Sequence, residues 1–211
     1  MLDFKKDYKE QYQPNADPSV IELPRMTVIA IDGWGDPNKG AEYEAAIEAL
    51  YALSYAIKMA KKAVLEYVVA PLEGFWDLAG RLDDGAPDGD APITDKNAFT
   101  WTSFIRQPGF VDAAVFEQAR VTVTKKKPGL DISKARLQTI DEGLCVQAMH
   151  IGPYDSESET IAALHQYAYE NGYAIDQSSA RRHYEIYLSD PRKIAPEKMK
   201  TVIRLPIARR A

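Results

Sequence analysis

Two short stretches, one near the end of each half of the chain, have nearly the same sequence, and this repeat limits the fold more than any other feature. Residues 105–108 read IRQP and residues 203–206 read IRLP. In the strand-like segment before each stretch, a glutamate precedes an aromatic residue by two positions, as in Glu73-Gly-Phe75 and Glu185-Ile-Tyr187. Such a repeat indicates two copies of one unit, each too small to bury both faces of its sheet alone.

The hydrophobic pattern predicts the same order of elements in both halves, namely strand, strand, helix, strand, strand. In the first half, the pattern predicts a hairpin of strands 20–24 and 26–31, a helix over 42–62, and strands over 68–76 and 99–106. In the second half, it predicts a hairpin of strands 136–140 and 144–149, a helix over 156–171, and strands over 183–188 and 201–206. Ser156 and Glu159 have the spacing of a capping box, and Gly172 is a typical helix stop.

The expected fold is α+β, with duplicated strand-helix-strand-strand modules, antiparallel sheets and a pseudo-twofold axis. Within one compact domain we expect an N-terminal arm (1–19), a first module (20–110), a connector helix and loop (111–133) and a second module (134–211). The helices are expected to cover one face of the sheet. The opposite face is expected to form a central ligand groove.

Charge and composition argue against several classes of partner and cofactor. The net charge of −5 repels phosphate backbones, and the basic run 125–127 is typical of a solvated helix end, so we expect no nucleic-acid partner. Cys145 is the sole cysteine, and no secretory signal or membrane span is visible, which predicts a cytoplasmic protein. The histidines lack metal-ligand spacing and the acidic segment 83–95 lacks the order of a calcium loop, so we expect neither metal nor cofactor.

Glu185 is the first candidate for chemistry. Strand alternation places His183, Glu185 and Tyr187 on one face, whereas the apolar alternate face suits packing under the helices. A carboxylate among aromatic rings is partly desolvated, which raises its pKa and makes it a stronger base. The alternative is an edge-strand glutamate that faces water.

Glu73 occupies the matching position in the first half and is the second candidate, with a surface glutamate as its alternative. If both carboxylates lay in one groove, they could act as an acid and base pair. Trp76 falls on the expected helix-packed face, which predicts core packing for that ring. The rings expected to line the groove are those of Trp34, Tyr55, Phe75, Trp101, Tyr154 and Tyr187.

The chain resembles the GyrI-like small-molecule-binding proteins. The segments HIGPYDSESETIAAL and HYEIYLSDPRKIAPEKMKTVIRLPI are similar to that family's signature, and IDGWGDPN, PLEGFW and FTWTSFIRQP extend the likeness over nearly the whole chain. The resemblance implies a groove at the pseudo-twofold axis with Glu185 facing it, and it points to a stand-alone subgroup without a DNA-binding domain. Some members of that subgroup hydrolyse cyclopropane-bearing DNA-alkylating compounds inside an aromatic cage. Family members often have two tryptophans where this chain has Phe75-Trp76.

Two functions follow from these expectations. The first is hydrolysis of a flat, electrophilic cyclopropane compound, with Glu185 positioning or deprotonating water and Tyr154 or Tyr187 donating a hydrogen bond to the carbonyl that gains charge. The second is sequestration of flat apolar or cationic xenobiotics without turnover. A protein partner in the groove is a third alternative. The chain is expected to be a monomer or a homodimer.

Overall fold

The computed structural model describes residues 1–37, 40–78 and 98–210, so the acidic segment 83–95 lies outside the described residues. The main sheet consists of β2 (Ser19–Leu23), β3 (Met26–Trp34), β5 (Leu72–Leu78), β6 (Phe99–Arg106), β7 (Arg136–Ile140), β8 (Gly143–Ile151), β9 (Tyr173–Ile175), β10 (His183–Tyr187) and β11 (Lys200–Arg209). Its order is β2-β8-β11-β10-β5-β6-β3-β7, with β9 attached to β11, and every described ladder in it is antiparallel. The expected α+β class with an antiparallel sheet is therefore confirmed.

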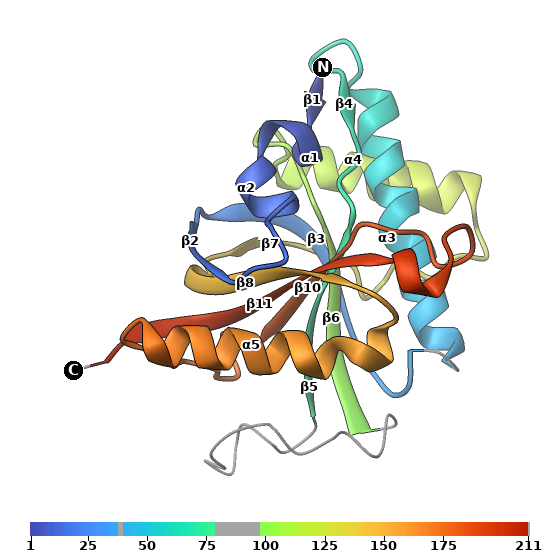
Figure 1. The fold of residues 1–211 in the computed structure, drawn as a ribbon. Helices are drawn as coiled ribbons and strands as arrows, with labels where there is room; N and C mark the ends of the chain where they lie inside the picture. The colour runs from blue at the N-terminus through green and yellow to red at the C-terminus, as the bar shows by residue number, and fades with distance from the viewer. Residues whose placement is uncertain (38–39, 79–97, 211) are drawn as a thin grey trace.

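The long helices form where the 3.6-residue pattern predicts them (Figure 1). They are α3 (Ala41–Ala60), α4 (Ala113–Lys126) and α5 (Glu157–Glu170), with a 3₁₀ turn, η2 (Tyr154–Ser156), before α5. Asp112 caps α4 by accepting a hydrogen bond from the Val115 amide. The expected capping box is wrong, because the Ser156 hydroxyl donates to the Pro153 carbonyl instead of capping α5.

The shorter elements lie at the N-terminus and in the connections. They are β1 (Leu2–Asp3), which pairs in parallel with β4 (Tyr67–Val68), then α1 (Phe4–Asp7), α2 (Lys9–Tyr12) and the 3₁₀ turn η3 (Pro196–Lys198). The expected N-terminal arm thus contains two short helices.

The two expected hairpins are wrong, because their outer strands are exchanged. β2 pairs with β8 rather than β3, and β7 pairs with β3 rather than β8. The connection between β2 and β3 is Pro24-Arg25, and a two-residue hairpin turn needs residues that adopt positive φ, which proline does not. After Pro24-Arg25 the chain therefore does not fold back to pair β3 with β2.

The exchange also brings the two ends of the sheet together. β2 and β7 are the outermost strands of the order, yet only two residues separate β2 from its sequence neighbour β3, and two separate β7 from β8. Two residues span less than about 10 Å, so the sheet must curl until its ends approach. An ion pair links the two connections, with Arg25 Nε 2.8 Å from Asp141 Oδ2.

From each end of the sheet toward its middle, the strands of the two halves come in the same order. This order is β3-β6-β5 in the first half and β8-β11-β10 in the second. The strand order is thus compatible with two related units. Their duplication, their pseudo-twofold axis and the boundaries at residues 19, 110 and 133 stay predictions.

The long helices and the cleft share one face of the sheet, so the expected separation of helices from groove is wrong. α5 packs through Leu164 on Ile203 and Leu205 of β11. α3 packs on β3 and β6 and lies over the same face further along the sheet. The opposite face carries Tyr184 and Ile186, and the N-terminal helices α1 and α2 cover it (Figure 1).

A buried polar cluster joins those N-terminal helices to the middle of the sheet. Glu73 is fully buried, and its carboxyl accepts hydrogen bonds from the hydroxyls of Tyr12 and Tyr184. The repeated arginines both reach Gln11, because Arg106 donates to its side-chain oxygen and Arg204 to its backbone carbonyl. Burial raises the pKa of Glu73, while the two hydroxyl donors and the two arginines lower it.

We predict that Glu73→Ala lowers the free energy of unfolding by about 3–5 kcal/mol, because it leaves buried charges and hydroxyls without their partner. Tyr12→Phe removes one hydrogen bond and should cost about 1–2 kcal/mol. Urea denaturation followed by circular dichroism measures both losses. Glu22→Gln, on the exposed side of β2, is the control, and a Glu73→Ala loss no larger than that of the control would contradict the role assigned to the cluster.

Candidate functional site

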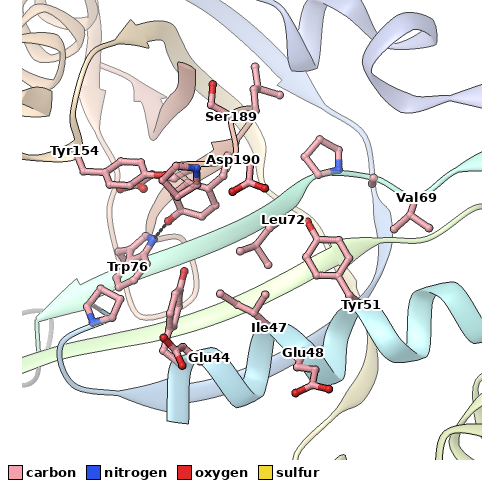
Figure 2. Close-up of a pocket in the computed structure, with 18 of the residues that line it drawn as sticks. Glu44, Ile47, Glu48, Tyr51, Val69, Leu72, Trp76, Tyr154, Ser189 and Asp190 are labelled. Atoms are coloured by element: carbon pink, nitrogen blue, oxygen red, sulfur yellow. Dashed lines mark hydrogen bonds between the residues drawn. The ribbon is translucent and has the colours of Figure 1, made fainter. Parts of the chain in front are cut away.

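A cleft of about 2160 Å³ opens between α3 and α5, with β5 and β10 as its floor. Figure 2 shows Ile47 and Tyr51 of α3 on one side, opposite Leu72 and Trp76 of β5. The aromatic residues that line the cleft are Tyr43, Tyr51, Tyr55, Trp76, Phe99, Tyr154 and Tyr187. The aromatic lining suits a flat molecule, and the volume is larger than the roughly 300–1,000 Å³ typical of pockets for drug-sized ligands.

The register of β5 and β10 determines which side chains reach the cleft. Glu185 lies directly opposite Gly74, and His183 lies opposite Trp76. Directly opposite residues of an antiparallel pair point to the same face. A side chain at Gly74 would place its Cβ 3.1 Å from Trp76 Nε1 and 3.5 Å from the Tyr187 hydroxyl. The glycine therefore leaves room for the hydrogen bond that Trp76 Nε1 donates to Tyr187 Oη at 2.5 Å.

The rings form a connected wall. Trp76 lies between Phe99, with centroids 5.5 Å apart, and Tyr43, at 5.8 Å. On the other side, Tyr154 contacts Tyr187 edge to face, with centroids 5.8 Å apart. Tilted and edge-to-face contacts of this kind stabilise the rings relative to one another.

Glu185 supplies a carboxyl to the floor of this aromatic cleft. Glu185 is 8% exposed, and its Oε1 lies 2.9 Å from His183 Nε2. The Tyr187 hydroxyl also hydrogen-bonds to Glu185. Burial, followed by the charge of Glu185, raises the pKa of Tyr187, and this hydrogen bond contributes in the same direction. Two side chains thus fix the orientation of the carboxylate.

The tyrosines around Glu185 keep their protons. Burial, followed by the charge of Glu185, raises the pKa of Tyr154 to about 12. Burial and Glu185 also raise the pKa of Tyr43. Both residues are therefore neutral phenols at physiological pH, able to donate hydrogen bonds to a bound molecule.

A second carboxyl, that of Glu157 at the start of α5, lines the same cleft. It is 9% exposed, and its Oε1 is buried without a hydrogen-bond partner. Burial, followed by the negative charges of Glu185 and Asp155, raises the pKa of Glu157 well above that of an ordinary carboxyl. The cleft thus contains two buried glutamates with different surroundings, Glu185 and Glu157, and Glu73 is not one of them.

Five of the predicted site residues line the cleft: Glu185, Tyr154, Tyr187, His183 and Tyr55. Tyr55 is 51% exposed and lies at the open end, beside Tyr51 at a centroid distance of 6.3 Å.

The expected placement of Glu73 and Phe75 in the groove is wrong. In the register of β5 and β10, Glu73 is opposite Ile186 and Phe75 is opposite Tyr184, so both point to the face covered by the N-terminal helices. Phe75 is 5% exposed and packs on Phe104 and Tyr184. Consequently Glu73 and Glu185 lie on opposite faces of the sheet.

Trp34 and Trp101, which were also predicted to line the groove, are outside the cleft lining. Trp34 ends β3, is 67% exposed, and has the Lys134 ammonium 5.6 Å from its ring centroid. Trp101 is 1% exposed and contacts Tyr43 edge to face at 5.0 Å. Trp101 therefore supports a ring of the wall from behind, where a side chain on Gly33 would collide with it at 2.2 Å.

Sequence reasoning missed Trp76, Tyr43, Tyr51, Phe99 and Glu157. The core role expected for Trp76 is wrong, since its ring lines the cleft. A signal for this face was present in Gly74, because a glycine inside a strand indicates a close approach, and alternation then places Trp76 beside it. Tyr43, Ile47, Tyr51 and Tyr55 recur every four residues, which predicts a continuous stripe on α3.

Neither a metal-binding cluster nor a membrane-spanning helix occurs in the described ranges, 1–37, 40–78 and 98–210. They contain no group of three or more His, Cys, Asp or Glu side chains arranged to hold a metal ion. No helix within them has the length and apolar character to cross a membrane.

Comparison with known proteins identifies relatives over the whole chain. The profile of the GyrI-like small molecule binding domain matches residues 110–208. An uncharacterized conserved protein from Listeria innocua is 44% identical, with 99% of this chain and 100% of that chain covered and a TM-score of 0.90. None of the curated proteins matches the sequence.

Two further structures from Listeria innocua are described as hydrolases. One is 42% identical, covers 99% of this chain and 100% of its own, and has a TM-score of 0.87. The other is 43% identical, covers 98% and 99%, and has a TM-score of 0.86. The profile match and the full-length likeness agree with the cleft described above, and the chain belongs to the GyrI-like small-molecule-binding family.

Proposed function

We propose that this protein binds flat apolar or cationic xenobiotics in the cleft and hydrolyses cyclopropane-bearing DNA-alkylating compounds. The observation that carries the proposal is the carboxyl of Glu185, nearly buried on the floor of an aromatic cleft. Two full-length relatives described as hydrolases support turnover rather than binding alone.

The aromatic wall would position the substrate. A flat conjugated ring system can stack against Trp76 and Tyr43 on one side and contact Tyr154 on the other. This arrangement excludes bulk water and holds the strained ring near Glu185.

Glu185 would act as the general base. It accepts a proton from one water molecule, the water oxygen forms a bond to the methylene carbon of the cyclopropane, and the ring carbon–carbon bond breaks. The electron pair moves into the conjugated carbonyl, whose oxygen becomes a hydroxyl after protonation. His183 and Tyr187 orient the carboxylate through the contacts described above.

Tyr154 is the better of the two tyrosines for the developing oxyanion. The proton of Tyr187 is engaged with Glu185, whereas Tyr154 lines the cleft as a neutral phenol. A hydrogen bond from Tyr154 to the carbonyl oxygen would strengthen as that oxygen gains charge.

A non-catalytic binding role is the second candidate. The carboxylates of Glu44, on α3 beside the tyrosine stripe, and of Glu185, on the floor, line the cleft. Negative charge close to aromatic faces favours cationic ligands. In this role the protein would sequester such compounds unchanged.

We propose a cytoplasmic protein that acts as a monomer or homodimer, without cofactor, metal or nucleic acid. The buried single thiol of Cys145 and the net charge of −5 support this assignment.

We predict that Glu185→Gln lowers the rate of hydrolysis by about 10²–10⁴-fold, because the amide accepts no proton from water. Incubation with a cyclopropane-bearing alkylating compound and mass spectrometry of the ring-opened, hydrated product measure the rate. Glu159→Gln is the matched control, since Glu159 is an exposed glutamate on the same helix as the cleft residue Glu157 but outside the cleft lining. Equal rates in Glu185→Gln and wild type would remove the role of Glu185.

We predict that methyl viologen, a flat dication that quenches tryptophan on contact, gives a saturable loss of fluorescence. Trp76→Phe should abolish the saturable component, because Trp76 is the tryptophan in the cleft lining. Trp34→Phe should remove only a linear, collisional component, since Trp34 is exposed outside that lining. Saturable quenching together with unchanged cyclopropane compound in the first assay would favour sequestration over hydrolysis.

A further inference from the structure

Glu157 lies in the cleft without the partners that would stabilise its charge. It is the first residue of α5, 9% exposed, and its Oε1 is buried with no hydrogen-bond partner. A buried polar atom left without a partner is unfavourable, so a ligand that supplies a partner to this atom binds more tightly.

The groups that act on Glu157 come from two neighbouring elements. Glu185 and Tyr187 belong to β10, and Tyr154 and Asp155 belong to η2. None of these four groups is a cation. Glu185 in turn has His183 Nε2 at 2.9 Å and the hydrogen bond with Tyr187. Of the two carboxyls, Glu185 is therefore the better site for the negative charge and Glu157 the better site for a proton.

The position of Glu157 at a helix N-terminus works against this assignment but is the weaker effect. The dipole of α5 favours an anion in its first turn, but only weakly. Burying a second, uncompensated carboxylate beside Glu185 is strongly unfavourable. The burial cost is larger, and the proton stays on Glu157.

We propose that Glu157 is the proton donor of this site, holding a carboxylic acid hydrogen toward a hydrogen-bond-accepting oxygen of the bound molecule. The inference rests on the proposed hydrolysis and extends it, because it assigns a general acid and specifies the ligand class. A suitable ligand would be flat and would carry a carbonyl oxygen on the side of α5.

The two carboxyls then account for every proton in the reaction. As the water oxygen bonds to the cyclopropane methylene, Glu185 takes the water proton. As the ring bond breaks, its electron pair flows to the carbonyl oxygen, and Glu157 gives that oxygen its proton. The product contains one added water. A proton transfer from Glu185 back to Glu157 restores the starting state, so one pair of glutamates supports repeated turnover.

Infrared spectroscopy tests the proton directly, without turnover. We predict a carboxylic acid C=O band at pH 7 in wild type that is absent in Glu157→Gln and retained in Glu159→Gln. The difference between wild type and Glu157→Gln isolates this residue from other buried acids such as Glu73 and Glu142. Addition of 9-fluorenone, a flat ketone without a cyclopropane, should shift the band to lower frequency as the acid donates to the ketone oxygen. Absence of the band, or a band that 9-fluorenone leaves unmoved, would overturn the assignment.

Kinetics separates this inference from the proposed function. We expect Glu157→Gln to lower kcat by about 10²-fold and to abolish the loss of activity at high pH, because the amide donates a hydrogen bond but no transferable proton. Wild-type activity in Glu157→Gln beside an inactive Glu185→Gln would refute the acid role and leave the hydrolase proposal standing. If neither variant loses turnover, the acid role of Glu157 and the base role of Glu185 are both refuted.

Discussion

The buried carboxyl of Glu73 fixes which face of the sheet is closed. Two tyrosine hydroxyls donate to it, and the charges of Arg106 and Arg204 act on it from the two repeated stretches. Because these polar groups are removed from water, each depends on the others for its partners. The N-terminal helices complete the cluster through Tyr12 and Gln11, so that face is covered and only the opposite face remains for a ligand.

Strand β10 connects this closed face with the cleft. Tyr184 points down to Glu73, while its neighbour Glu185 points up between the aromatic rings. The same alternation gives the two glutamates different chemistry. Glu73 has its donors within the protein, whereas the cleft carboxyls of Glu185 and Glu157 face the space where a small molecule binds. Support for the site thus comes from the far side of one short strand.

Local patterns were sufficient to predict the helices, most strands and the place of Glu185. The periodicity of α3 and the alternation of β10 each reflect one buried side, which a sequence shows well. The face of β5 was not predictable in the same way, because both of its faces are covered and either set, Glu73 with Phe75 or Gly74 with Trp76, could face the cleft. Glu157 was missed because its burial depends on the approach of β10, and no local pattern reports a tertiary contact.

The exchange of β2 and β7 restricts how the cleft can adapt to ligands. Each half of the sheet takes its outer strand from the neighbourhood of the other, and the Arg25–Asp141 ion pair joins the two corners. A hinge motion that separated the two halves of the sheet would have to break the hydrogen-bonded ladders between β2 and β8 and between β3 and β7. The floor of the cleft therefore has an essentially constant width. Tolerance of ligands of different size must then come from rotation of individual rings, such as the half-exposed Tyr55, about their own bonds.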